Sequence, residues 1–100
     1  MDKRHVSRIA AAVGLPEVPE DWSGIDAVWL LLERMKSEGA VVLVKLDGAR
    51  GPLAGPYTVF ASGGLLDRNS LRADEHTVEA ALVHVIVNYA AAAWGISLPA

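Results

Sequence analysis

Few side chains in this sequence are placed to bind a metal or to act as an acid or base. His76 follows Asp74 and Glu75, and His84 comes eight residues after His76. Eight residues span about 12 Å on a helix, which is too far for one metal ion, and no two histidines stand four residues apart. We therefore predict no metal site, and we assign residues 74–76 to helix capping rather than to a general base.

A serine nucleophile has no better support. Ser62 precedes Gly63 and Gly64, but the first glycine of the G-x-S-x-G turn that exposes a catalytic serine is missing. The glycines at positions 48, 51 and 55 match neither a phosphate-binding loop nor a dinucleotide-binding motif. An enzyme built on Ser62, His76 and Asp74 is one hypothesis, but no set of nucleophile, base and oxyanion donors can be drawn. We predict that the protein is not an enzyme and needs no cofactor.

The composition is that of one globular domain. The chain has 100 residues, of which 52% are hydrophobic and 21% charged, so it can bury enough apolar surface to offset the entropy of ordering. The absence of cysteine excludes disulfides, thiolate zinc sites and iron–sulfur clusters. The net charge of −3 argues against tight binding to nucleic acid.

Two helices joined by a loop are predicted in the first 39 residues. Apolar residues at positions 6, 9, 10 and 13 share one helical face, and the apolar run that follows the basic start is too short for a secretion signal. Residues 15–22 contain two prolines and three carboxylates and predict a loop. Ser23 then caps a second helix, with Asp26 three positions on, and Gly39 ends it.

Strands and a last helix are predicted in the rest of the chain. Residues 40–46 form a β-branched run in which Val42, Val44 and Leu46 share one face, and residues 56–62 also place their apolar residues on one face, so both segments predict strands. Residues 70–73 predict a short third strand. The glycine- and proline-rich segment between the first two is long enough for a mobile binding loop. Asp74 or Thr77 caps a final, nearly apolar helix that runs to about Trp94. This helix is too short to span a membrane, so it is a core helix or one that meets a partner.

Acidic residues gather in two blocks. Between Ile9 and Glu33 the chain carries five carboxylates and no Lys or Arg, and the C-terminal block holds Asp74, Glu75 and Glu79. Two interpretations stay open: carboxylates that favour helix N-termini, or a docking face for a basic partner, formed where the loop and the start of the last helix meet. Trp22 lies in the acidic loop, and we expect it to be exposed and part of an interface.

The predicted element order resembles known families of small α+β proteins. The α-β-β-β-α part, over roughly residues 25–92, looks like the double-stranded-RNA-binding domain. In that family a lysine cluster opens the last helix and holds phosphates, whereas the matching stretch here is DEHTVEAAL, so we expect no nucleic-acid binding. The segment YTVFASGG…LRADEHTVEAALVHVI resembles the antitoxin half of Hic-type toxin–antitoxin pairs. The small, acidic, cysteine-free chain is also similar to bacterial immunity proteins that mask a basic nuclease toxin.

We therefore expect an α+β fold with two N-terminal helices, a two- to three-stranded antiparallel meander and a long apolar C-terminal helix. The favoured function is a cytoplasmic inhibitor of immunity or antitoxin type that occludes a basic toxin. The expected partner-binding residues are Glu17, Glu20, Asp21, Trp22, Asp26, Asp74 and Glu75. The alternative is a self-associating phage or secretion-related subunit that forms a homodimer through the last helix, which Ala91→Glu would disrupt. Neither hypothesis involves a membrane.

Overall fold

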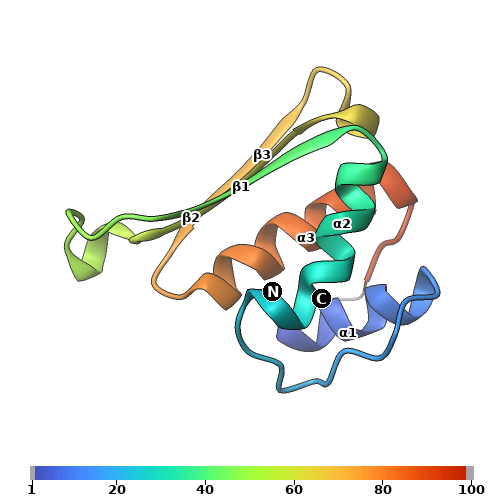
Figure 1. Cartoon of the computed structure of the whole chain (residues 1–100), viewed down its shortest axis with the longest axis horizontal. Coiled ribbons are helices and arrows are strands. Elements are labelled where there is room, and N and C mark those ends of the chain that lie inside the picture. Colours follow the sequence, from blue (N-terminus) through green and yellow to red (C-terminus); the bar gives the residue numbers. More distant parts are fainter. Residues whose placement is uncertain (1, 99–100) are drawn as a thin grey trace.

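The computed structural model describes residues 2–98 and has an α+β architecture (Figure 1). Its elements in chain order are α1 (Lys3–Ala12), the 3-10 turn η1 (Ile25–Val28), α2 (Trp29–Ser37), β1 (Ala40–Leu46), η2 (Pro52–Ala54), β2 (Tyr57–Gly63), η3 (Gly64–Leu66), β3 (Ser70–Glu75) and α3 (Val78–Trp94). The expected order of helices and strands is thereby confirmed, and the weakly marked third strand is present.

The three strands form an antiparallel meander in the order β1-β2-β3. Val44 pairs with Val59, which pairs with Ala73, and the next row of this face holds Val42, Ala61 and Leu71. These rows face the helices, whereas the alternate residues form the opposite face of the sheet, because successive side chains point to opposite faces.

All three helices lie on one side of the sheet (Figure 1). Helix α3 packs against β2 and β3, α2 packs against β1, and α1 covers the side of α3 that is turned away from the sheet. Because α3 lies between the sheet and α1, it has buried residues on more than one of its faces. They are Ala81, Leu82, Val83, Val85, Ile86, Tyr89 and Ala90. Within residues 2–98, no helix covers the opposite face of the sheet (Figure 1).

The start of the second helix differs from the sequence prediction. Ser23 does not cap it; a 3-10 turn comes first, and α2 begins at Trp29 without a side-chain cap. Gly24 is the reason, since it adopts a positive φ of 77° and its N–H donates to the carboxylate of Glu79 at 2.7 Å. A distant residue therefore takes the place of the predicted local cap.

Only one of the two predicted caps begins the last helix. Thr77 is the cap, because its hydroxyl accepts a hydrogen bond from the N–H of Ala80 at 3.1 Å. Asp74 and Glu75 belong instead to β3, which extends two residues beyond the predicted strand. In the described part of the chain, no helix combines the length and the hydrophobicity needed to cross a bilayer.

Candidate functional site

The segment that we call the acidic loop, residues 15–26, is fastened along α1. Trp22 donates its indole N–H to the carbonyl of Lys3 at 2.9 Å, and the ammonium of Lys3 lies 5.4 Å from the centre of the Trp22 ring. Ser7 donates its hydroxyl to the carbonyl of Pro19 at 3.1 Å. Trp22 is only 3% exposed, so the expectation of an exposed Trp22 is wrong. The indole fixes the loop to the helix, because burial of an aromatic ring is favourable when its N–H finds a hydrogen-bond acceptor.

Four carboxylates point outward from this fastened loop. Glu17, Glu20, Asp21 and Asp26 are all exposed. Across residues 2–98, none of the four takes part in an ion pair or a side-chain hydrogen bond. The charge of Glu20 does act on Arg4 of α1 and contributes, after Asp2, to the raised pKa of that guanidinium. The loop therefore presents negative charge to solvent from a fixed backbone.

Glu79 joins the acidic loop to the first turn of α3. Its carboxylate accepts the N–H of Gly24, and this hydrogen bond holds the pKa of Glu79 below its usual value. The loop and the start of the last helix thus meet, as the sequence suggested, but the contact is made by Glu79. This carboxylate serves as a structural acceptor that sets the path of the loop.

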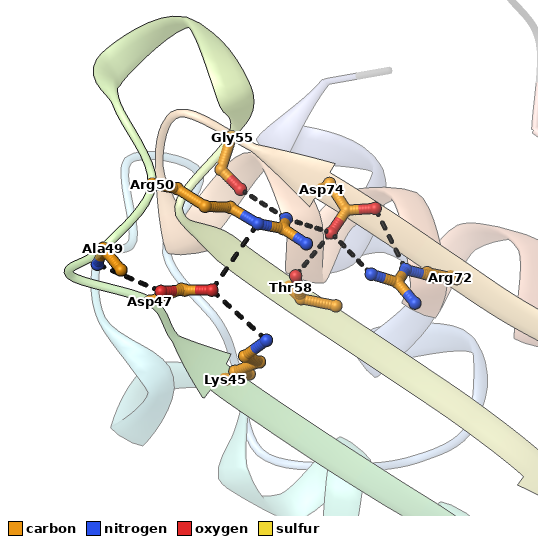
Figure 2. Close-up of polar contacts among 8 residues, drawn as sticks. All are labelled: Lys45, Asp47, Ala49, Arg50, Gly55, Thr58, Arg72 and Asp74. Carbon is orange, nitrogen blue, oxygen red and sulfur yellow. Dashed lines mark hydrogen bonds and ion pairs between the residues drawn. The ribbon is translucent and has the colours of Figure 1, made fainter.

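Asp74 and Glu75 do not share one surface, so the two together do not extend the acidic loop. They are neighbours on β3, so their side chains point to opposite faces of the sheet. Asp74 lies on the face without helices, where it accepts hydrogen bonds from Arg72 at 3.0 Å, Arg50 at 2.9 Å and the hydroxyl of Thr58 (Figure 2). Its pKa is well below the usual value, because of the bonds to Arg72, Thr58 and Arg50 in that order. Two arginines thereby neutralise this predicted partner-binding carboxylate.

Arg50 also closes the loop between β1 and β2. Arg50 donates to the carbonyl of Gly55 at 3.1 Å as well as to Asp74, and Asp47 accepts the N–H of Ala49 at 3.0 Å (Figure 2). Gly55 packs so closely on β3 that a Cβ there would come within 2.9 Å of the Asp74 backbone. The predicted binding loop is therefore tied to the end of the sheet, with Leu53 in it 95% exposed.

The residues of the enzyme hypothesis are far apart. Ser62 pairs with Ser70 at one end of the β2–β3 ladder, and Tyr57 pairs with Glu75 at the other end, next to His76. Five residue steps of a strand separate the two ends, which is about 17 Å. Ser62 and His76 therefore do not form a nucleophile–base pair. Within residues 2–98, no group of three or more His, Asp or Glu side chains is arranged to hold a metal ion.

Apolar side chains on β1 are the surface feature that the sequence analysis overlooked. Val41 and Leu43 lie on the face of the sheet without helices and are 55% and 57% exposed. Leu43 pairs with Phe60 on β2, and Phe60 pairs with Arg72 on β3. The signal was present in the sequence, because AVVLVKL is apolar at both odd and even positions. A strand with solvent on one face alternates apolar and polar residues, so this run indicates contacts on both faces.

Comparison of the chain with protein-family models, with curated proteins and with solved structures found no match.

Proposed function

We propose that this protein is a binding protein of the inhibitor type, which covers a basic site on a toxin partner with its acidic loop. The observation that carries the proposal is the set of four exposed carboxylates on a loop fastened by Trp22, Ser7 and Glu79. A fixed loop loses little conformational entropy when it docks, so more of the contact free energy remains as affinity.

Electrostatics supports a basic partner for this loop. Exposed carboxylates that form no ion pair within the chain raise the association rate with a positive surface and fix the orientation of the encounter. Trp22 contributes by holding the loop and not by direct contact, while Asp74 and Glu75 are left out of the proposed face. The mechanism is steric and electrostatic occlusion of the partner's active or substrate-binding site. A toxin of the nuclease class acts in the cytoplasm, which is the location that the proposal implies.

The test begins with capture of partners from the native lysate at low and at high salt. We expect a stoichiometric basic protein that is lost as the salt concentration rises, since screening weakens contacts between exposed charges. Glu20→Lys combined with Asp21→Lys should slow association with that protein at least tenfold and should abolish inhibition of its activity.

A matched pair of variants separates the loop from net charge. Glu20→Gln with Asp21→Asn changes the charge by the same amount as Ala91→Lys with Ala92→Lys on the exposed side of α3. Only the loop variant should weaken binding. Equal affinity of the loop variant and the wild type, with circular dichroism unchanged in both, would refute the assigned face, and failure to inhibit the captured protein would refute the inhibitor function.

A further inference from the structure

β1 is an edge strand whose outer backbone groups can be identified. Asp47 donates its N–H to the carbonyl of Pro56 at 2.8 Å, one step beyond the pair of Leu46 with Tyr57. Hydrogen-bonded pairs alternate along an antiparallel ladder, so positions 45, 43 and 41 direct their N–H and C=O groups to β2. Positions 46, 44, 42 and 40 therefore direct theirs to the free edge.

Nothing in the described chain occupies this edge. Strand β1 pairs with β2 alone, and no backbone hydrogen bond from residues 2–98 reaches Val42 or Val44 from a helix or a loop. Edge strands are usually protected by prolines, several charges or a bulge. β1 has no proline and a single charged residue, Lys45. Its free edge is therefore an open template for another strand.

An apolar groove runs along the same edge. It lies between α2 and β1 and has a volume of about 490 Å³. Its apolar lining comes mainly from Ile25, Trp29 and Leu32 on one side and from Val42 and Val44 on the other. Trp29 is 50% exposed, which is a large apolar area for a side chain next to the core. A strand added to β1 would place alternate side chains in this groove, as in recognition by strand addition.

We infer that the strand added at this edge is β1 of a second copy of the chain, paired antiparallel about a two-fold axis at Leu43. In this register the edge-facing Val42 is opposite the partner's Val44, and Leu43 is opposite the partner's Leu43. Lys45 is then opposite the partner's Val41, so the two lysines do not face each other. The product is one six-stranded antiparallel sheet with all helices on the same side.

Charge favours a second copy over an unrelated strand. Glu33 and Lys36 both line the groove from α2, where their charged atoms lie 3.6 Å apart. A two-fold axis makes α2 run opposite to the partner's α2, which reverses the order of the acidic and the basic residue, so that opposite charges can be matched between the copies. The surface is thereby complementary to itself, as a two-fold interface requires. The inference is independent of the four carboxylates of the acidic loop, none of which lines this groove.

The first experiment measures the mass of the protein in solution by sedimentation velocity over a hundredfold range of concentration. We expect a dimer in the wild type and a monomer in Val42→Pro, because proline removes an N–H that points to the free edge and takes part in no bond to β2. Leu65→Lys, a charge at an exposed residue of η3, serves as the control and should remain dimeric. A wild type that is monomeric throughout, or a dimeric Val42→Pro, overturns the inference.

The second experiment tests the register. Leu43→Lys and Leu43→Glu each place like charges opposite each other at the axis, so each variant alone should be monomeric, with dimerisation at least tenfold weaker. An equimolar mixture should recover the dimer, because lysine then faces glutamate. Leu43 is more than half exposed, so neither variant disturbs the core. A mixture that stays monomeric overturns pairing at Leu43, and a dimer broken by Ala91→Glu but not by Val42→Pro assigns the interface to α3 instead.

Discussion

Two carboxylates, Glu38 and Asp74, collect hydrogen bonds in very different surroundings. Glu38 accepts from the hydroxyl of Tyr89 at 2.7 Å and from the indole of Trp94 at 2.9 Å, and its side chain is 19% exposed. Asp74 is held by Arg50, Arg72 and Thr58 and is 33% exposed. The partners of Glu38 are mostly neutral aromatic donors near the core, whereas those of Asp74 are mostly cations at the surface.

The difference lies in what each carboxylate connects. Glu38 ends α2 and joins it to α3, where the Tyr89 and Trp94 rings meet edge to face at 5.1 Å. Arg34 lies over the Trp94 ring and donates to the carbonyl of Val13 beyond α1. Three helices thus depend on one cluster. The Asp74 cluster connects only the loop of residues 47–56 to the sheet, so its loss should be felt locally.

The largest effect is expected from Glu38→Ala. It leaves the donors of Tyr89 and Trp94 without their acceptor in a poorly hydrated place, which costs about 2–4 kcal/mol of unfolding free energy. Urea unfolding followed by tryptophan fluorescence measures the loss. Glu17→Ala, which removes an exposed carboxylate that forms no ion pair, is the control and should change stability by less than about 0.5 kcal/mol. Equal stability of the Glu38 and Glu17 variants would show that the Glu38 cluster does not hold the helices together.

A smaller and local effect is expected from Asp74→Ala. Exposed ion pairs contribute little, so the global free energy of unfolding should fall much less than in Glu38→Ala. The loop of residues 47–56 should nevertheless open, because Arg50 loses its anchor on the sheet. Trypsin cleavage after Arg50 and exchange of the loop amides should both become faster. Asp26→Ala is the control for loss of a carboxylate, and unchanged cleavage in the Asp74 variant would contradict the proposed closure.

The smallest expected effect is on the pH dependence of stability, which should differ between the two clusters. The pKa of Asp74 is lowered in the fold, so its contribution is present above about pH 4 and is lost as the pH falls further. Burial, followed by the bond to Glu38, raises the pKa of Tyr89 above its usual value of 10.0, so that contribution is lost as the pH rises beyond 10.0.

Urea titrations at acid, neutral and alkaline pH measure both trends. Asp74→Ala should flatten the acid side of the stability curve and Tyr89→Phe the alkaline side, each relative to the wild type. Other lowered carboxylates, such as Asp47, remain in both proteins and cancel in this comparison. An acid limb that is unchanged in Asp74→Ala would show that its ion pairs do not stabilise the fold.

Local patterns were sufficient for most of the elements, but not for the start of α2. The β-branched run of residues 40–46 predicted a strand whose bounds the structure confirms, and Thr77 was one of two predicted caps for α3. Both signals depend on residues within a few positions of one another, where side-chain direction and backbone hydrogen bonding are fixed by the period of the element.

Contacts between distant segments decided the surfaces. Trp22 is buried because Lys3 accepts its indole N–H, and Asp74 is neutralised because Arg50 comes from 24 positions earlier in the chain. Similarly, Glu38 meets Trp94 across 56 positions. No local pattern encodes which carboxylate obtains a counter-ion or which strand lies at the edge of the sheet.

The sequence by itself determined most of the helices and strands and the surplus of acidic charge. Only the tertiary structure decided which of those charges and apolar side chains remain open to a partner, because burial and pairing follow from the packing of whole elements.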